Sequence, residues 1–237
     1  MLQSKKKRDF KRRKNMKKRV LIRKKMGKRV FFTLTHCSKK LEGISNKYNY
    51  KANIHNLCFV GASFYNVKYQ SSIMTNCNYR DSNILGVDYF NCNMRSSSFK
   101  NVRMTNVVFY NCNLKGVDFS NAIFKNVTFI CTNLNETKNL NIYDKEIRIL
   151  HTYNPIKLDE SIEKRLLDLA HNKSIYEARV LHVNKNKLNH WNLGLICQDY
   201  GIEAIDLLSV ILNKKEDWNN MYTVFSYMLL IEKWKGK

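Results

Sequence analysis

The chain has 237 residues, of which 44% are hydrophobic and 12% aromatic, so it can bury a sizeable core and is not disordered as a whole. No stretch reaches the roughly 18 apolar residues of a membrane span, and no signal-peptide pattern is present. Seven cysteines without a secretory signal indicate free thiols in a reducing compartment. These features predict a cytoplasmic protein, and the formal net charge of +23 suggests an anionic partner.

The first segment, residues 1–40, is predicted to be a basic and mostly disordered tail. Between Lys5 and Arg29 it carries 16 Lys or Arg residues against one acid, Asp9, and its apolar residues fit no single helix face. Met16 and Met26 are alternative start positions. If the tail has a partner, the charge favours nucleic acid or an anionic membrane surface. The candidate polyanion contacts are Lys5, Lys6, Lys7, Arg8, Lys11, Arg12, Arg13, Lys17, Lys18, Arg19, Arg23, Lys24 and Lys25.

The second segment, residues 52–136, repeats with a period of five residues. Every fifth position from Ile54 onward is large and apolar or aromatic, at 17 positions without an exception. A second set lies two residues before each of these, and apart from Leu57 its members are small and uncharged. The 17 large positions are Ile54, Phe59, Phe64, Tyr69, Met74, Tyr79, Ile84, Tyr89, Met94, Phe99, Met104, Phe109, Leu114, Phe119, Phe124, Phe129 and Leu134.

A period of five fits neither a helix nor a flat strand, but it fits one side of a square coil. The large residue and the small one point inward, and the other three residues form the corner and the outer face. Four sides make one coil of 20 residues, and coils stack at a strand spacing of about 4.8 Å. The predicted interior columns are Ile54, Met74, Met94, Leu114 and Leu134; Phe59, Tyr79, Phe99 and Phe119; Phe64, Ile84, Met104 and Phe124; and Tyr69, Tyr89, Phe109 and Phe129.

The runs CNLKG at 112–116 and VDFSN at 117–121 follow one order: a small residue, Asp or Asn, Leu or Phe, and two variable residues. In this pattern the chain resembles the pentapeptide-repeat proteins. The resemblance implies a mainly β solenoid, a right-handed quadrilateral β-helix, of about four and a quarter coils over 52–136. Cys77, Cys92 and Cys112 are then packed core thiols, and glycines such as Gly61 and Gly86 serve corners.

The third segment follows a transition over residues 137–158, which contains the only proline, Pro155. Over residues 159–235 the apolar period becomes helical, which predicts either a small α-helical domain or a cap over the open end of the coil. Five helices are expected. The first follows Asp159 and has the apolar face Ile162, Leu166, Leu169 and Ala170, and the second begins with a capping box formed by Ser174 and Glu177. The third carries Leu188, Trp191, Leu195 and Ile196 and ends at Gly201. The fourth carries Ile205, Leu208 and Leu212, and the fifth runs from Trp218 to Leu229.

No catalytic, cofactor or metal site is predicted, because the sequence holds no HExxH motif, no CxxC pair and no phosphate loop. His171, His182 and His190 are expected on helix surfaces or in packing contacts. A helix-turn-helix over Leu188 to Leu212 is disfavoured, since its second helix is acidic and apolar where a recognition helix presents basic and amide side chains. The protein is therefore not expected to be an enzyme or to have a small-molecule substrate.

Two functions remain open. The first is a non-enzymatic scaffold that binds a macromolecular partner, an anionic one if the basic tail takes part. The second, implied by the resemblance, is a DNA mimic that binds a type II topoisomerase such as gyrase and gives drug resistance or immunity. Mimicry needs negative charge on the rod, yet residues 52–136 carry seven basic and four acidic residues, a net charge of about +3. The scaffold is the favoured hypothesis.

Overall fold

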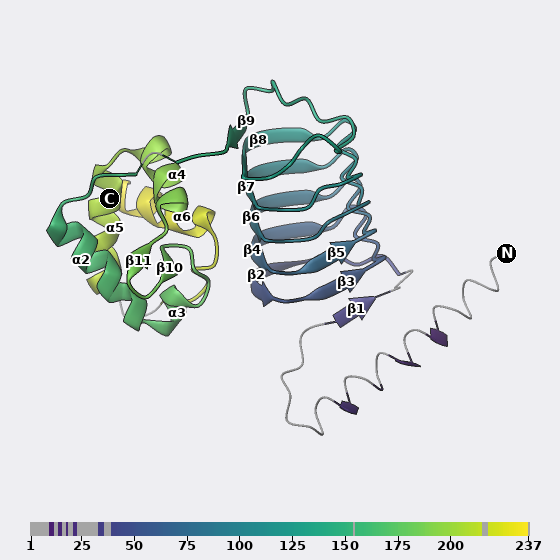
Figure 1. Ribbon diagram of the computed structural model, residues 1–237, viewed down its shortest axis with the longest axis horizontal. Helices are drawn as coiled ribbons and strands as arrows, with labels where there is room; N and C mark the ends of the chain where they lie inside the picture. The colour runs from purple at the N-terminus through teal and green to yellow at the C-terminus, as the bar shows by residue number, and fades with distance from the viewer. Residues whose placement is uncertain are drawn as a thin grey trace.

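The computed structural model describes residues 39–153, 155–214 and 218–236, the backbone of 33–35, and residues 10, 11, 14, 15, 18, 21 and 22 of the N-terminal segment. Within these residues the chain forms two bodies that lie side by side, a stack of coils and a helical region (Figure 1). The stack comes first in the sequence, and the helical region follows it.

The stack is a β-solenoid, as predicted, and it has about five turns where about four and a quarter were expected. Its main sheet consists of six parallel strands: β2 (Gly43–Tyr50), β4 (Ser63–Gln70), β6 (Asn83–Phe90), β7 (Arg103–Tyr110), β8 (Ile123–Ile130) and β9 (Ile147–Leu150). A second parallel sheet contains β1 (Thr33–Thr35), β3 (Asn53–His55) and β5 (Ile73–Thr75). Residues 20 apart pair directly, as Phe64 with Ile84 and Met104 with Phe124.

The solenoid extends beyond the predicted 52–136 at both ends. Strand β2 precedes this range, and β9 lies in the segment predicted to be a linker. Stepping by five places Asn49 and Asn139 at interior positions, so the side-chain pattern ends there. Pairing nevertheless continues, with Asn49 opposite Tyr69 and Ile149 opposite Phe129. Backbone hydrogen bonds between coils do not require a large side chain, and they carry the solenoid past the end of its apolar repeat.

The interior consists of stacked side chains. Of the 17 large repeat positions, 16 are buried and Leu134 is half-buried. Aromatic rings stack nearly parallel along two columns. In one column, Tyr79 lies with its ring centroid 5.1 Å from that of Phe59 and 4.7 Å from that of Phe99. In another, Tyr89 and Phe109 have centroids 5.0 Å apart. Such contacts add to the free energy of burying the rings.

Most hydroxyl and thiol side chains at the small inward positions form hydrogen bonds with the neighbouring coils, although Ser82 Oγ has no partner among the described residues. The hydroxyl of Ser97 accepts a hydrogen bond from the backbone N–H of Cys77 at 3.1 Å and donates to the carbonyl of Met74 at 2.9 Å. The thiol of Cys92 donates to the carbonyl of Tyr69 at 3.3 Å. Burial without an unpaired polar atom costs little, so Ser, Thr and Cys alternate with Ala and Val in the core.

Every fifth residue from Lys51 to Cys131 has a positive φ and forms a corner of the coil. Nine of these 17 corner residues are Asn and three are Gly, the residue types that best tolerate this conformation. The corner asparagines also form ladders between coils. Asn111 Nδ2 donates to Asn91 Oδ1 at 2.8 Å, and Asn126 Nδ2 donates to Asn106 Oδ1 at 2.8 Å. The abundance of Asn in the sequence thus has a structural cause.

The helical region contains α2 (Glu160–Asp168), the 3-10 helix η1 (Leu169–His171), α3 (Lys173–Tyr176), α4 (His190–Tyr200), α5 (Glu203–Lys214) and α6 (Val224–Lys235), with the hairpin β10 (His182–Asn184) and β11 (Lys187–Leu188). Helix α4 ends at Gly201, where φ is +85°, as predicted. The predicted capping box at Ser174 was wrong, because the side chain of Asn172 accepts hydrogen bonds from the N–H groups of Ser174 and Ile175. The last helix begins after Thr223, not at Trp218.

The helical region packs against the side of the solenoid rather than over its end (Figure 1). Helix α6 contacts strands β6 and β7 in the middle of the main sheet. Two buried solenoid residues, Val108 and Ile130, belong to the same apolar cluster as helix residues such as Leu195 and Met228. The cap predicted as one alternative is therefore wrong, and the helices form a lateral body.

A corner substitution tests the role of the left-handed asparagines. We expect Asn111→Ala to lower the free energy of unfolding by about 1 to 2 kcal/mol, because Ala disfavours the positive φ and cannot continue the ladder. Asn111→Gly keeps the conformation and should cost about 1 kcal/mol less than the Ala variant. Asn135→Ala is the control, an exposed asparagine that is not among the positive-φ residues. Equal losses for Ala and Gly in urea denaturation would contradict the assignment.

Candidate interaction surfaces

Two outward columns of the main sheet form the surface that the helical region covers, here called the docking face. In each strand, residues on either side of the inward aromatic position point outward. The first column is Tyr48, Lys68, Asp88, Val108, Thr128 and Arg148, and the second is Gln70, Phe90, Tyr110, Ile130 and Leu150. Six of these eleven residues are apolar or aromatic and three are charged, so burial of the docking face requires partners for its charges.

The N-terminal end of α6 is attached by hydrogen bonds to Asp88 of the docking face and to the neighbouring corner residue Asn66. The hydroxyl of Thr223 donates to Asn66 Oδ1 at 2.8 Å, and Asn66 Nδ2 donates to the carbonyl of Asn220 at 2.8 Å. Beside them, the N–H of Val224 donates to Asp88 Oδ2 at 3.0 Å. An acid at this end of a helix also interacts favourably with the helix dipole. These three contacts orient α6 on the solenoid.

Lys68 and Asp88 form a buried ion pair within the docking face. Lys68 Nζ lies 3.8 Å from Asp88 Oδ2, and the two side chains are 2% and 6% exposed. Burial lowers the pKa of Lys68, and burial raises the pKa of Asp88 to about 6, although each charge opposes the effect on the other. Asp88 Oδ1 has no hydrogen-bond partner among the described residues. Lys68, which counted as a surface charge in the sequence, is therefore part of an interface.

Gly86 provides the space in which Phe225 of α6 rests. A Cβ atom at Gly86 would lie 2.0 Å from Phe225 Cδ1, so any side chain there would displace the ring. The φ of Gly86 is +64°, which independently favours glycine. The ring of Phe225 also meets that of Tyr65 edge to face at a centroid distance of 6.0 Å.

A second set of contacts attaches α4 to the last coils. Arg148 Nη1 donates to Asp199 Oδ1 at 2.8 Å, and Asn126 Nδ2 donates to Asp199 Oδ2 at 3.3 Å. The rings of Tyr110 and Trp191 meet edge to face at 6.0 Å. The helical region is thus fixed at two places along the solenoid.

The rest of the solenoid surface is not covered by the helices, and its charge is positive. Within residues 52–136, burial of Lys68 and Asp88 leaves six basic and three acidic residues at the surface. The acids lie beside basic partners in the pairs Arg80–Asp81, Lys100–Asp118 and Lys115–Glu136. Arg95, Arg103 and Lys125 are exposed and have no acidic partner within ion-pair distance in the described part of the chain.

The structure says little about the predicted polyanion contacts. Of the thirteen, only Lys11 and Lys18 are described, and both are exposed. The remaining eleven lie outside the described residues: Lys5, Lys6, Lys7, Arg8, Arg12, Arg13, Lys17, Arg19, Arg23, Lys24 and Lys25. Their contact with a partner stays a prediction.

In the helical region, residues that were considered for a helix-turn-helix or a metal site lie in packing contacts. Helix α5, the second helix of the disfavoured helix-turn-helix, buries six residues in the core. His182 is buried and its Nε2–H donates to the carbonyl of Leu166 at 2.7 Å, while burial lowers its pKa. Among the described residues, no group of three His, Cys, Asp or Glu side chains is placed to hold a metal ion. No described helix is long and apolar enough to cross a membrane.

The stacked coils of five-residue sides define a β-solenoid protein built from repeats. The family model described as pentapeptide repeats matches eight copies over residues 90–126 and 103–138. Residues 90–138 thus match the pentapeptide-repeat family, and the C-terminal helices lie outside the matched range.

Solved structures with similarity to the chain include proteins described as pentapeptide-repeat proteins. Rfr23 from the cyanobacterium Cyanothece 51142 shares 18% identity over 43% of this chain and 59% of its own, with a TM-score of 0.25. This chain therefore spans less than two thirds of Rfr23. A protein from the Arabidopsis thaliana thylakoid lumen shares 16% identity over 69% of this chain and 88% of its own, with a TM-score of 0.26.

A third structure is a trypsin-treated form of QnrB1, described as a plasmid-mediated fluoroquinolone resistance protein. It shares 10% identity over 50% of this chain and 90% of its own, with a TM-score of 0.17. A comparison with curated proteins finds no match.

Substitutions at Gly86 and Gly116 can be compared to test the contact between Gly86 and Phe225 of α6. Both have a positive φ, but a Cβ at Gly116 meets its nearest atom, Ser96 Oγ, at an ordinary 3.6 Å. We expect Gly116→Ala to cost about 1 to 2 kcal/mol of stability through φ alone. Gly86→Ala should cost more and should increase hydrogen exchange of α6 amides, because Phe225 is displaced. Equal effects of the two variants on α6 would contradict the proposed docking.

The buried Asp88 predicts a pH dependence. Its pKa is raised from 3.8 to about 6 on folding, so the stability it contributes is complete below pH 3.8 and is lost as the pH rises through 6. Relative to Asp88→Asn, the wild type should lose up to about 3 kcal/mol of unfolding free energy between pH 4 and 7. The exposed Asp81→Asn variant should follow the wild type, and a difference that is constant with pH would refute the effect.

Proposed function

We propose that this chain is a non-enzymatic scaffold that binds nucleic acid through its basic N-terminal segment, with the solenoid as a rigid support. The observation that carries the proposal is the distribution of charge. Residues 5–29 hold 16 basic residues and one acid, and this segment leads directly into the first strands of the solenoid. Phosphate contacts by Lys and Arg release counterions, which makes such a segment attractive to any polyanion.

The solenoid supports this function because the surface that the helices leave uncovered is positively charged, as the N-terminal segment is. A polyanion held by the segment would next meet surface residues such as Arg95, Arg103 and Lys125, which have no acidic partner in the described structure. The helical region covers one side of the solenoid and leaves these residues exposed.

Nucleic acid is a better partner for the segment than a membrane. A helix that binds in a membrane interface needs an apolar face as well as charge. The apolar residues between Lys5 and Arg29 follow no helical period, so the segment offers charge without such a face. The proposal places the protein in the cytoplasm, where buried thiols such as Cys77 and Cys112 stay reduced.

A DNA mimic that protects a topoisomerase is the second candidate, and the charge argues against it. A rod that imitates duplex DNA must present negative charge to its partner. Here three surface acids within residues 52–136 face six basic residues, and each acid lies in an ion pair. The exposed rod therefore attracts anions rather than imitating one.

The test is binding to a labelled duplex DNA and a single-stranded RNA, measured by fluorescence anisotropy between about 50 and 200 mM salt. We expect the wild-type log K to fall linearly with log salt. Replacing the thirteen candidate contacts by Gln in the full chain should weaken binding at low salt by at least about tenfold and flatten the salt dependence. Deletion of residues 1–29 should have the same effect.

The control variant is Lys173→Gln/Lys185→Gln/Lys187→Gln, which removes three exposed charges from the helical region and should bind as the wild type does. Unchanged affinity in the variant with thirteen substitutions would show that the tail is not the nucleic-acid contact. Tighter binding to anionic vesicles than to either nucleic acid would favour a membrane partner. Protection of gyrase supercoiling from a quinolone at stoichiometric protein would favour the topoisomerase candidate.

A further inference from the structure

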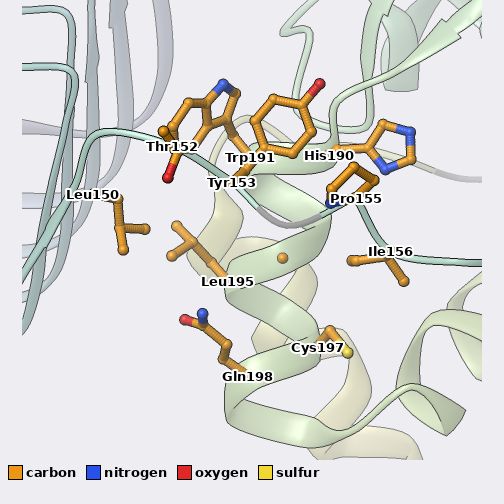
Figure 2. Close-up of a pocket in the computed structure, with 11 residues that line it drawn as sticks. Leu150, Thr152, Tyr153, Pro155, Ile156, His190, Trp191, Leu195, Cys197 and Gln198 are labelled. Carbon is orange, nitrogen blue, oxygen red and sulfur yellow. The ribbon is translucent and has the colours of Figure 1, made fainter.

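A pocket with a volume of about 440 Å³ lies between helix α4 and the chain that leaves the solenoid after β9 (Figure 2). Leu150 and Leu195 lie on one side, Ile156 and Cys197 lie on the other, and Tyr153 and Trp191 lie at one end. The volume is within the range of about 300 to 1,000 Å³ that small-molecule sites occupy. The sequence alone predicted no such site.

The lining is uncharged. None of the eleven described residues that line the pocket is Asp, Glu, Lys or Arg, although 26% of the whole chain is charged. A charged ligand would lose its hydration without gaining a counter-charge there, which is costly. The pocket therefore favours an uncharged and largely apolar occupant.

Gly194 lines the pocket, and no close contact in the fold requires a glycine there. It lies in the interior of α4, where Gly costs about 1 kcal/mol relative to Ala. It is not among the glycines with a positive φ, and a Cβ built on it meets no described atom within 4 Å. Gly86 differs in this respect, since Phe225 fills the space over it. The space over Gly194 stays open.

The aromatic end of the pocket suits a flat, uncharged ring. The ring of Tyr153 lies 4.9 Å from that of Trp191 and 6.0 Å from that of His190, measured between centroids. Aromatic surfaces of this kind interact with ligand rings by stacking or by edge contact. His190 also has a buried Nδ1 with no hydrogen-bond partner among the described residues. Because this atom is closed to solvent, the ring of His190 offers the pocket a surface rather than a hydrogen-bonding group.

We propose that this pocket binds an uncharged aromatic small molecule, seated over Gly194 against Trp191. The probe is 2-naphthol, titrated into the full-length protein by calorimetry. Wild type should show saturable binding of one molecule per chain. Gly194→Leu, which fills the space, should weaken it at least tenfold. Gly194→Ala should unfold at higher urea concentration than the wild type, since it removes the helix penalty without a clash.

Three controls make the result specific. Asn135→Leu adds the same side chain on the exposed solenoid and should leave naphthol binding unchanged. Ile156→Trp fills the pocket from its other side and should also abolish binding, which covers the case in which Gly194→Leu fails to fold. The anion 2-naphthoate should show no binding that depends on Gly194.

The proposal is overturned if wild type shows no saturable naphthol binding, or if the Gly194→Leu and Ile156→Trp variants, folded by circular dichroism, bind as the wild type does. Equal loss in Asn135→Leu would also overturn it, because binding would then not involve the pocket. Nucleic-acid binding by these variants should be unchanged, so the two proposals fail separately.

Discussion

Parallel pairing of backbone segments 20 residues apart is the interaction on which the rest of this structure depends. It places each residue directly beside its counterpart in the next coil, so interior side chains stack and exterior side chains form columns. The left-handed corners, with their Asn and Gly residues, let the chain turn after every five residues. The aromatic stacks and the asparagine ladders are consequences of this register.

The same register creates the docking face. Outward residues of the main sheet form columns in which apolar and aromatic side chains predominate, and α6 packs across them. Within this apolar contact, the Lys68–Asp88 pair and the Asn66–Thr223 hydrogen bond are directional. Apolar burial supplies most of the stabilisation, while polar contacts of this kind restrict the position of the helix, since any other placement would leave a buried charge or amide unpaired.

Lateral docking determines which surfaces remain for partners. An end cap would have left all sides of the solenoid open, whereas the lateral helices cover the docking face and leave the basic residues on the other sides exposed. It also brings the chain after Leu150 against α4, which encloses the pocket over Gly194 (Figure 2). A positive solenoid surface and an uncharged pocket thus occupy separate places on one molecule.

The sequence by itself determined the solenoid interior and the helical nature of the C-terminal region. In a coil with five-residue sides, the place of a residue within its repeat determines whether its side chain points inward. Residues such as Phe109 and Phe129 were therefore assigned correctly to one interior column. The ends of the solenoid were missed because backbone pairing continues past Asn49, where the apolar repeat stops. Only the tertiary structure decided where the helices dock. Asp88 and Val224 are 136 residues apart, and a contact between such distant positions leaves no period in the sequence. Burial of Lys68 and the open space over Gly194 follow from that docking, so no local pattern predicts them.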